Sequence, residues 1–454
     1  MIENYINYFY LDERRLDDRD QNKIETNELK LDRLHYWKRL LGKEERFFEE
    51  SIRTVSGIDK KDLLFLSENK SHPTEKAQEE EWIFFLEKLR TGKYDQIQIP
   101  FFQSIHVPFT PFFKPFLQMG LAETKKRLGS LWNLDDKIIH SLIINLAQIL
   151  FETSNRTLIL ELNIARVSGL LKGETPEERF QYFSHVLLKD KKFISYLHHE
   201  YPVLIRLLIT KTIYWSKHIA EMIERLERDR SIITNEFHKG EPIGELQQIH
   251  LGLGDPHNKG KGVVMLQFDS GLKIIYKPRP LEIEIQFQKL LHWLNNHRPT
   301  KEPFYIMKVV NKEKYGWVEF IEYKGCNSVD EIEHFYNKIG QQLALLYVLN
   351  AVDFHYENLI AHHKHPVLID LESLFHQSIA ESQLGETAIE RAEAMLQRSV
   401  QSTGFLPRPL FYHEDPKAGA ADVSGLGATD EQRAPIKIPT ITQDNTDQMK
   451  IVQD

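Results

Sequence analysis

Apolar side chains recur every three or four residues through much of the first half of the chain. Near the N-terminus four residues set the pattern: Leu31, Leu34, Trp37 and Leu41. The same period predicts amphipathic helices over residues 135–152 and 189–230. Between them, Thr175 followed by Pro176 and two glutamates predicts a helix start, because Thr caps free backbone N–H groups and Pro fits the first turn. We therefore predict a mostly helical region over residues 1–235.

Residues 101–117 depart from this pattern, because three prolines stand among many phenylalanines. Proline lacks a backbone N–H, and its ring clashes with the preceding helical turn, so a regular helix is not expected here. We predict an extended connector whose aromatic rings hold it against a core. A peptide-binding groove is the alternative interpretation.

Near residue 232 the period of the apolar positions changes from helical to alternating. Two strands are predicted over residues 263–268 and 273–277, joined by a tight turn at Asp269-Ser270-Gly271. The remaining predicted elements are a helix over 281–296, strands over 304–310 and 317–323, and a helix over 331–348. The change predicts a domain boundary between about 230 and 245 and an α+β fold for the whole chain.

A hairpin is predicted further along, where two short apolar runs flank a polar tip of histidine and lysine. Asn358 opens the first run, with Asp353 and His355 just before it. Asp370 directly follows the second run. Because a hairpin brings the start of one strand beside the end of the other, we expect Asp353, Asn358 and Asp370 to converge at one end.

These residue types suit phosphoryl transfer. A carboxylate can orient or deprotonate an attacking hydroxyl group, while an amide and a second carboxylate can hold Mg²⁺ on nucleotide phosphates. Protein kinases carry an Asp, an Asn and a metal-binding Asp in this chain order, and the spacing here is more similar to that of lipid kinases. A polar turn between two edge strands is the competing interpretation, because D-x-H-x-x-N alone recurs by chance.

A glycine-rich loop over residues 252–262 precedes the two predicted strands, and Lys277 ends the second of them. Glycines such as Gly252 and Gly254 let backbone N–H groups approach phosphate oxygens. Lys277 could supply a cation to the phosphates of a nucleotide, although a solvated lysine at a strand edge is the simpler interpretation.

The helix after Lys277 has two acidic residues in its first turns, Glu282 and Glu284. Either could pair with Lys277, and the residues alone leave the choice open. Acids that merely stabilise a helix N-terminus are the alternative. Residues 324–327 are the predicted hinge, where an adenine ring could contact the backbone.

Composition narrows the function classes. The chain has 454 residues, a formal net charge of −8 and a pI near 6.2, a balance that argues against a general nucleic-acid binder. Cys326 is the only cysteine in the sequence, so an intrachain disulfide and a cysteine-rich zinc site are both excluded, which suits a reducing cytoplasm. The N-terminal residues lack the pattern of a secretion signal, and the most apolar windows are too short and polar to span a membrane.

Several segments together resemble the dehydratase domain of class II lanthipeptide (lantibiotic) synthetases. The most similar are GLGDPHNKGKGVVMLQF at residues 252–268, KIIYKPRP at 273–280 and FHYENLIAHHKHPVLIDLES at 354–373. Further similar segments are NIARVSGLLKGETPEERF at 163–180, SVQSTGFLP at 399–407, DVSGL at 422–426 and NTD at 445–447. The resemblance covers essentially the whole chain.

The resemblance implies a lipid-kinase-like fold, with a nucleotide-binding N-lobe and a catalytic loop in a partial C-lobe. It also implies ATP- and Mg²⁺-dependent phosphorylation of Ser and Thr in a ribosomal precursor peptide. Lys277 matches the residue that binds nucleotide phosphates, and Asp353 the residue that orients or deprotonates the hydroxyl. Asn358 and Asp370 match the metal ligands, and His355 supports the catalytic loop or stabilises charge.

The same family then eliminates the phosphate to leave a dehydroamino acid, and its elimination residues match Asp255 and His257. This chemistry needs a base for the Cα proton and an acid or positive charge for the departing phosphate, and a Gly-flanked Asp-Pro-His loop offers both. Hydrogen bonding within the loop is the simpler role for these two side chains.

The sequence departs from the family in two ways. It holds no cyclase domain, and the segments that carry a further Arg and Thr of the elimination machinery lie beyond its last residue, so we expect a dehydratase that is cut short. The predicted domains are residues 1–235, 236–330 and 331–454. The expected partners are a precursor peptide, a separate chain with the missing C-lobe and cyclase, and an exporter complex, but no nucleic acid.

Two alternatives stay open. A non-catalytic peptide-binding remnant would bind no nucleotide through Lys277 and Asp370. An independent lipid or small-molecule kinase would keep the phosphotransfer residues but give no role to Asp255 and His257.

Overall fold

The computed structural model describes residues 7–10, 13–14, 50–54, 57–66, 80–297, 302–376, 387–408, 410–411, 420–427 and 438–453. The predicted helical pattern at residues 31–41 lies outside them. The chain forms two compact units. Unit 1 comprises residues 1–220 with 443–449, and unit 2 comprises residues 221–442 with 450–454. The domain boundaries predicted at residues 235 and 330 stay predictions.

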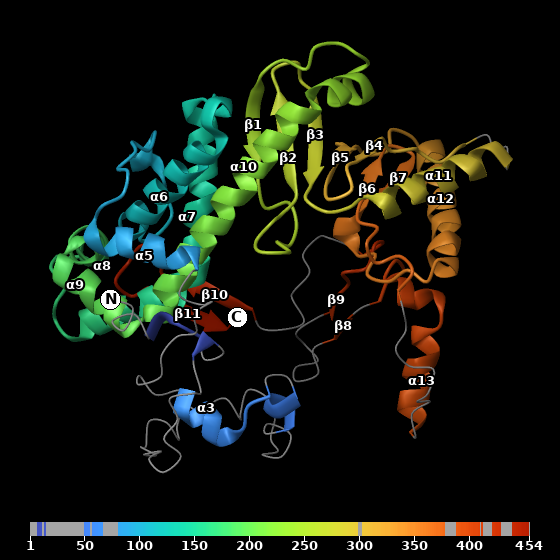
Figure 1. Cartoon of the computed structure of the whole chain (residues 1–454). Coiled ribbons are helices and arrows are strands. Elements are labelled where there is room, and N and C mark those ends of the chain that lie inside the picture. The colour runs from blue at the N-terminus through green and yellow to red at the C-terminus, as the bar shows by residue number, and fades with distance from the viewer. Residues whose placement is uncertain are drawn as a thin grey trace. The chain divides into compact units, whose positions relative to one another are not determined.

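Unit 1 is helical, as predicted (Figure 1). The α-helices of unit 1 whose bounds are described are, in chain order, α3 (Lys60–Leu66), α5 (Glu81–Thr91), α6 (Thr110–Leu128), α7 (Asp136–Val167), α8 (Pro176–His185) and α9 (Lys191–Glu200), followed by α10 (Pro202–His238), which continues into unit 2. Short 3-10 turns lie at Phe102–Ser104, Gly129–Leu131 and Leu187–Lys189. Helices α6, α7 and α8 pack against one another.

Helix α7 shows why these residues fold as they do. The Asp135 carboxylate accepts a hydrogen bond from the Ile138 N–H at 2.7 Å and so caps the first turn. Buried apolar side chains then recur along one face of the helix: Ile138, Leu142, Leu146 and Leu150. This stripe forms the interior of unit 1, because residues four apart lie above one another on a helix.

The extended connector predicted over residues 101–117 is wrong, because helix α6 begins at Thr110. Pro111 lies in the first turn, where its missing N–H has no helical partner. Pro115 costs about 3 kcal/mol inside a helix. The buried side chains of this stretch include Phe112, Phe113, Phe116 and Leu117. At about 1.5–3 kcal/mol each, their burial outweighs the proline.

Two predicted helices have different ends. Helix α7 continues 15 residues beyond the predicted end at residue 152, to Val167. Residues 189–230 form α9 and then α10, separated at Tyr201, because Pro202 lacks an N–H and disfavours helical geometry in the residue before it. The predicted cap is confirmed: the Thr175 hydroxyl accepts a hydrogen bond from the Glu178 N–H at 3.1 Å.

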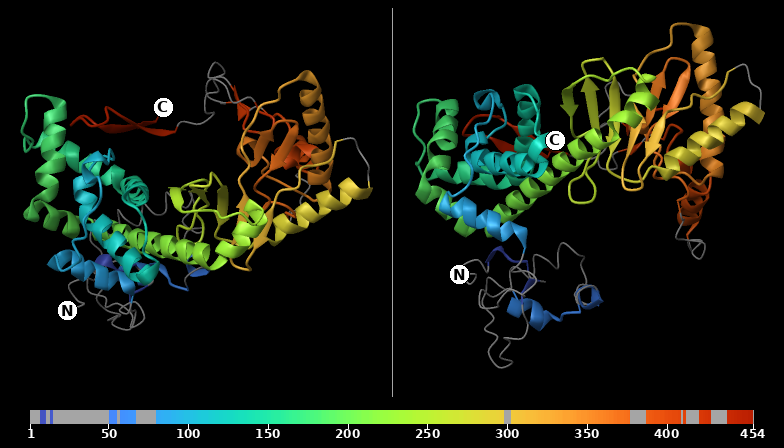
Figure 2. Two further views of the ribbon diagram at one scale, coloured as in Figure 1. Left: turned by 90° about the horizontal axis from the view of Figure 1, so that it is seen from above. Right: turned by 45° about the horizontal axis from the view of Figure 1, so that its top comes forward.

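Unit 2 is built on a five-stranded antiparallel sheet in the order β1-β2-β3-β5-β4 (Figure 1 and Figure 2). The strands are β1 (Leu246–His250), β2 (Val264–Phe268), β3 (Lys273–Lys277), β4 (Val309–Asn311) and β5 (Gly316–Glu319). The predicted hairpin between β2 and β3 is confirmed, with Met265 opposite Ile275. Together with unit 1, this sheet confirms the α+β fold class.

The predicted strand over residues 304–310 is mostly wrong, since only its end enters β4. Side chains of α11 (Glu282–His297) bind the preceding backbone instead. Asn295 bonds both the N–H and the C=O of Phe304, and Gln288 accepts from the Met307 N–H at 2.9 Å. These backbone groups therefore need no neighbouring strand.

The other predicted elements of unit 2 are present. Helix α11 is followed by α12 (Val329–Val348), and the predicted hairpin consists of β6 (Leu359–His362) and β7 (His365–Leu368), with β7 packed against α12. The remaining elements are a 3-10 turn at Tyr356–Asn358, α13 (Ala388–Gln397), a 3-10 turn at Val400–Thr403, and the short strands β8 (Leu410–Phe411), β9 (Ala420–Ala421), β10 (Pro439–Thr442) and β11 (Lys450–Gln453).

Residues 443–449 belong to unit 1 although they lie near the C-terminus. The buried Asp447 carboxylate is 2.5 Å from Nε of Arg179 in α8, and the Asp447 N–H donates to the Pro176 carbonyl. Asn163 of α7 donates to the Met449 carbonyl at 3.0 Å. The NTD segment therefore fills a place between two helices that are far earlier in the chain.

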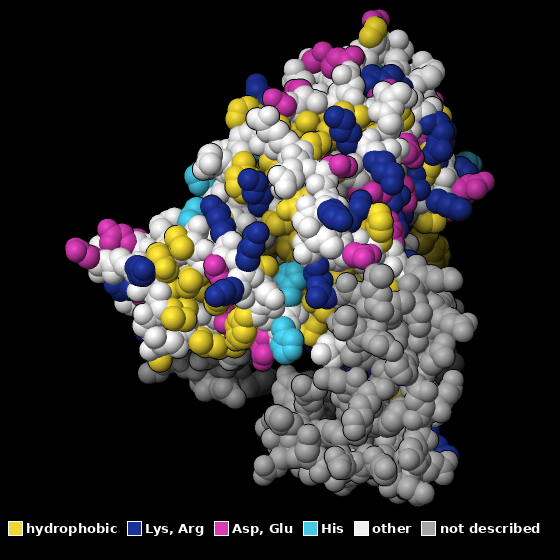
Figure 3. Space-filling view, turned by 60° about the vertical axis from the view of Figure 1, so that its left-hand side comes forward, with side chains coloured by type: hydrophobic (Ala, Val, Ile, Leu, Met, Phe, Trp, Pro, Cys, Tyr) yellow, Lys and Arg dark blue, Asp and Glu magenta, His cyan; other side chains and the backbone are white. Residues whose placement is uncertain are grey.

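On the face shown in Figure 3, charged side chains of both signs are interspersed with hydrophobic ones. None of the helices in the described ranges combines the length and the hydropathy that a membrane span requires.

Candidate active site

The β6–β7 hairpin brings Asn358 and Asp370 to the same end, as predicted. Leu359 and Leu368 are paired across the strands. One step beyond them, the Ile369 N–H donates to the Asn358 carbonyl at 3.1 Å. Asp370, the next residue, is partly exposed, with 41% of its side chain accessible.

Asp353 is held at this end by backbone contacts. The Asn358 amide donates to the Asp353 carbonyl at 2.9 Å, and the following Phe354 N–H donates to the Thr403 carbonyl. Asp353 has a φ of 64°, a left-handed conformation that its surroundings must stabilise. The residue is exposed, so its carboxylate is accessible to a substrate.

His355 supports the same loop. Its Nδ1 accepts a weak hydrogen bond from the Glu357 N–H at 3.4 Å, and its backbone forms an isolated bridge with Ser424. The neighbouring Tyr356 N–H donates to the Val423 carbonyl at 3.1 Å. The DVSGL segment is thereby joined to the loop that carries Asp353.

Lys277, at the end of β3, reaches the hairpin end. Its ammonium donates to the Ile369 carbonyl at 2.7 Å and lies 3.5 Å from the Glu284 carboxylate. Both side chains are buried, Lys277 at 8% and Glu284 at 0% exposure. The acid that pairs with Lys277 is therefore Glu284. Glu282 instead accepts hydrogen bonds from Asn311 and Gln286.

Burial is the largest influence on the pKa of the Lys277 ammonium and lowers it below its ordinary value. Glu284 and Asp370 oppose that shift, while the positive charge of Arg279 adds to it. A buried ammonium beside a partly exposed carboxylate is a suitable place for an anionic ligand, because a phosphate group would stabilise its charge.

Arg279 also belongs to this group, and the sequence analysis gave it no role. Its guanidinium contacts three carboxylates: Glu284 at 2.8 Å, Asp370 at 3.0 Å and Glu372 at 3.1 Å. The available signal was its place in KPRP, two residues after Lys277. Position in the sequence alone could not reveal the three partners.

The donor set fits Mg²⁺ as part of a site that a nucleotide would complete. Magnesium is usually held by one or two carboxylates together with substrate phosphates and water. Asp370 presents an accessible carboxylate, of which Oδ1 contacts Arg279. The Asn358 side chain uses its NH₂ group on Asp353, which leaves its oxygen for a metal. Within the described residues, no cluster of three His, Cys, Asp or Glu side chains could hold a metal alone.

The glycine-rich loop is exposed. Gly252 and Gly254 have φ values of 78° and 135°, which residues with a Cβ rarely adopt. His257 and Lys261 exchange two backbone hydrogen bonds across the tip. The Lys261 ammonium contacts Glu221 at 2.6 Å, which ties the loop to α10.

Asp255 and His257 lie on this loop with exposed side chains. In the described part of the chain, neither side chain forms a hydrogen bond or an ion pair with Lys277, Asp353 or Asp370. The structure thus brings together the predicted phosphotransfer residues, and it leaves the predicted elimination residues on a separate, accessible loop.

Backbone hydrogen bonds join the predicted hinge at residues 324–327 to the β6–β7 hairpin. The Lys324 N–H donates to the Ala361 carbonyl, and the Lys324 carbonyl accepts from the His363 N–H, both at 2.8 Å. The backbone of Lys324 is therefore occupied, and any adenine contact would fall to the other hinge residues.

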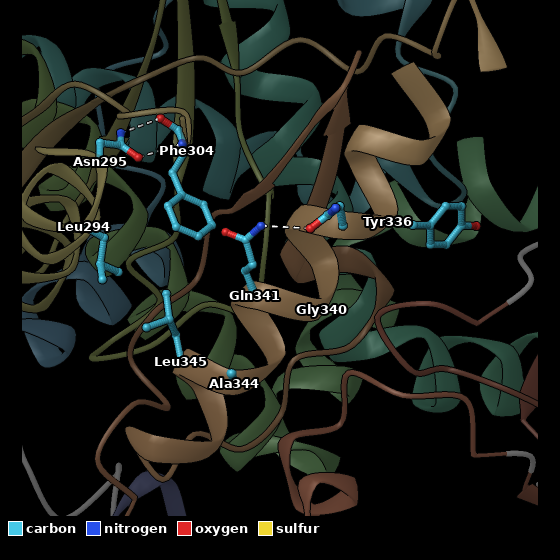
Figure 4. Close-up of a pocket in the computed structure, with 9 residues that line it drawn as sticks. Leu294, Asn295, Phe304, Tyr336, Gly340, Gln341, Ala344 and Leu345 are labelled. Carbon is cyan, nitrogen blue, oxygen red and sulfur yellow. Dashed lines mark hydrogen bonds between the residues drawn. The ribbon is translucent and has the colours of Figure 1, made fainter. Parts of the chain in front are cut away.

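A pocket of about 540 Å³ opens between α11 and α12 (Figure 4). Its lining side chains are apolar or polar without charge: Leu294, Asn295, Phe304, Tyr336, Asn337, Gly340, Gln341, Ala344 and Leu345. Asn295 binds Phe304, and Gln341 donates to Asn337 at 3.0 Å. This pocket contains none of the predicted site residues and offers no charged side chain to a phosphate.

Comparison with known proteins identifies the family to which this chain belongs. The model described as "Domain of unknown function (DUF4135)" matches residues 201–454, which include every predicted site residue. Over 270 residues the chain is 30% identical to the lacticin 481/lactococcin biosynthesis protein LcnDR2 of Lactococcus lactis subsp. lactis. The match covers 58% of this chain and 29% of that relative. The chain therefore belongs to the DUF4135 family and is a class II lanthipeptide synthetase-like protein.

Proposed function

We propose that this chain acts in lanthipeptide biosynthesis, where it dehydrates Ser and Thr residues of a ribosomal precursor peptide. The reaction would be phosphorylation with ATP and Mg²⁺, followed by elimination of the phosphate, on a lipid-kinase-like core. One observation carries the proposal: buried Lys277, paired with Glu284, donates to the backbone beside Asp370 at the hairpin end that also holds Asn358 and Asp353.

The chain order supports the kinase-like core. A glycine-rich loop, a lysine at the end of β3, a helix with a paired glutamate, and a loop with Asp, Asn and Asp follow one another as in kinases. The relative's name adds support, because it refers to the biosynthesis of a lantibiotic. The activity, substrate and partners of that longer protein remain proposals for this chain.

In the phosphorylation step, Asp353 accepts the proton of the substrate hydroxyl as the oxygen attacks phosphorus. ATP with Mg²⁺ would supply the phosphoryl group, and ADP would leave as the bond between the transferred phosphorus and its β-phosphate oxygen breaks. Lys277 would stabilise negative charge on the phosphates. Asn358 and Asp370 would hold the metal, and His355 keeps the Asp353 loop in place.

In the elimination step, His257 or Asp255 removes the Cα proton of the phosphorylated residue. The Cα–Cβ double bond forms as the Cβ–O bond breaks, and the phosphate leaves with the electron pair. Both side chains are exposed on the glycine-rich loop, where a peptide can reach them. The proposed partners are the precursor peptide, a chain with the remaining C-lobe and cyclase, and an exporter complex, with the reaction in the cytoplasm.

The direct test is to incubate the chain with ATP, Mg²⁺ and the precursor peptide encoded beside its gene, and then to measure the peptide mass. Loss of water at Ser or Thr is expected if both steps occur. Gain of phosphate without loss of water would support the first step only. The Asp255→Ala and His257→Ala variants should then accumulate phosphopeptide. An unchanged peptide mass with folded protein would contradict the proposal.

A further inference from the structure

The tip of the glycine-rich loop is closed by two backbone hydrogen bonds. The His257 N–H donates to the Lys261 carbonyl at 2.9 Å, and the Lys261 N–H donates to the His257 carbonyl at 2.8 Å. Between them, Asn258 and Lys259 have φ values of 39° and 67°, in the left-handed region that residues with a Cβ rarely adopt. Such conformations cost free energy and persist only where the surrounding structure holds them, often at functional sites. The contacts that hold this tip therefore bear on the function of the loop.

The side chains of His257 and Lys261 lie on the same side of the loop. Residues that exchange both hydrogen bonds of an antiparallel bridge are directly opposite each other, with Cα atoms about 5.5 Å apart. Their side chains project from the same face. The imidazole proposed for elimination is therefore a neighbour of the Lys261 side chain. A contact that fixes Lys261 also restricts the position of His257.

The Lys261 side chain is held by α10. Its ammonium lies 2.6 Å from a carboxylate oxygen of Glu221, and only 23% of the side chain is accessible. The aliphatic stem is mostly covered, so it restrains the loop together with the charged group. Glu221 in turn lies 3.4 Å from the Arg225 guanidinium, which donates to the Tyr276 hydroxyl of β3. The loop is thus anchored to a carboxylate that has a further partner on its own helix.

We propose that Glu221 is a positioning residue for phosphate elimination: through Lys261, it holds the loop that carries Asp255 and His257 where a base can reach the Cα proton. This inference rests on the elimination step of the proposed function. Within the described residues, neither Glu221 nor Lys261 forms a hydrogen bond or ion pair with the residues proposed for phosphorylation. The first step of the reaction should therefore not depend on this anchor.

The elimination step can be measured alone with a precursor peptide that already carries a synthetic phosphoserine. The chain is incubated with this peptide, Mg²⁺ and ADP, the other product of the first step, and mass spectrometry follows the loss of phosphoric acid. Glu221→Gln keeps the size of the side chain and removes its charge. Elimination is expected to slow about two- to fivefold, the range that a partly exposed ion pair provides. Phosphorylation of the unmodified peptide should proceed at the parental rate.

A double-variant cycle tests whether Glu221 acts through Lys261. Lys261→Met should slow elimination by the same factor as Glu221→Gln, and the two changes together should slow it no further, because each removes the same ion pair. Lys261→Arg keeps the charge and should eliminate near the parental rate. Glu227→Gln is the matched control, because Glu227 also lies on α10, is equally exposed at 36% and pairs with Arg230.

Hydrogen exchange separates positioning of the loop from a general loss of structure. The His257 and Lys261 amides are bonded to each other's carbonyls, so both should exchange faster in Glu221→Gln when the anchor is lost. Exchange in β2 and β3 should stay parental, because a partly exposed ion pair contributes little to global stability. Unchanged exchange in residues 252–262 would overturn the inference.

Two kinetic results would also overturn the inference alone. One is equal elimination by the parent and Glu221→Gln. The other is a loss in Lys261→Met that is much larger than in Glu221→Gln, because Lys261 would then bind the phosphate itself. Failure of the proposed function has a different signature: a parent chain that removes no phosphate from the phosphopeptide would contradict the elimination step, and the inference with it.

Discussion

Two buried carboxylates in unit 2 have opposite surroundings. Asp229 of α10 accepts hydrogen bonds from the Tyr315 hydroxyl at 2.7 Å and the Trp317 indole at 2.9 Å, and lies 3.3 Å from the Lys312 ammonium. Glu284 of α11 has the cations Lys277 and Arg279 as partners, and both also contact other groups.

The two environments act differently on charge. Burial tends to raise the pKa of the Asp229 carboxyl, but the hydrogen bonds from Trp317, Tyr315 and Lys312 outweigh it and hold the pKa below its ordinary value. Two of the partners of Asp229, Tyr315 and Trp317, are buried side chains of the sheet region, as expected of a structural contact. Glu284 shares cations that extend to exposed carboxylates, so binding of a ligand can redistribute the charge. The groups that the partners of a buried acid contact in turn therefore distinguish a candidate site from a structural contact.

The largest expected effect separates chemistry from folding. Asp353→Asn should lower the rate of peptide phosphorylation by about 10²–10⁴-fold, the usual contribution of a general base. Stability should stay near that of the parent, because Asp353 is exposed. Mass spectrometry of the peptide at successive reaction times measures the rate. Asp136→Asn, an exposed acid in the first turn of α7, is the control and should phosphorylate at the parental rate.

The second effect tests the structural half of the comparison. Asp229→Ala should destabilise the protein by about 3 kcal/mol, because it leaves two buried donors and an ammonium without their acceptor. Chemical denaturation measures the loss. MgATP affinity of the folded variant should remain parental. A loss of affinity without a loss of stability would mean that Asp229 belongs to the site after all.

The third prediction extends the comparison to a buried cation. Lys338, at 2% exposure, lies 3.2 Å from Nδ1 of His365. Burial, with Lys338 next, lowers the pKa of His365 from 6.5 to about 4. The unfolded chain therefore binds a proton below pH 6.5 that the folded chain binds only near pH 4. Stability is complete above pH 6.5 and falls as the pH decreases toward 4.

His365→Asn should reduce that acid sensitivity, because Asn keeps an acceptor for Lys338 but does not titrate. Denaturation midpoints at several pH values measure it. His198 in unit 1 has its pKa lowered to about 4 as well, first by burial, so some pH dependence should persist. An unchanged slope in the variant would show that His365 does not contribute.

The smallest effect belongs to unit 1. Thr175→Ala should cost about 1 kcal/mol, because it removes the side-chain cap of α8. Hydrogen exchange should show faster exchange in α8 and little change in the sheet of unit 2. Thr175→Ser keeps the hydroxyl and is the control. Equal destabilisation by both substitutions would locate the effect in packing of the methyl group instead.

The sequence predicted features that depend on neighbouring residues. The β6–β7 hairpin, the β2–β3 turn and the Thr175 cap all follow from short patterns, and the hairpin alone brings Asn358 to Asp370. This convergence could be predicted because two strands joined by a short turn have few alternative arrangements.

Features that depend on distant packing were not predictable. The sequence could not choose between Glu282 and Glu284, because both lie in the first turns of α11 and only packing sets which one faces Lys277. Arg279 was missed because two of its three partners, Asp370 and Glu372, come from a distant segment. The helix that contains Pro115 was missed because the free-energy cost of a proline inside a helix can be judged from neighbouring residues. The burial of aromatic side chains that offsets this cost depends on packing against the rest of unit 1.

The docking of residues 443–449 has a consequence for the order of synthesis. Asp447 leaves the ribosome 268 residues after its partner Arg179. By then the described helices of unit 1 and most of unit 2 have already been synthesised. Until then the place between α7 and α8 has no occupant, and the first unit of the growing chain stays incomplete. Its last folding step therefore comes after translation of the sheet, hairpin and site residues of the second unit.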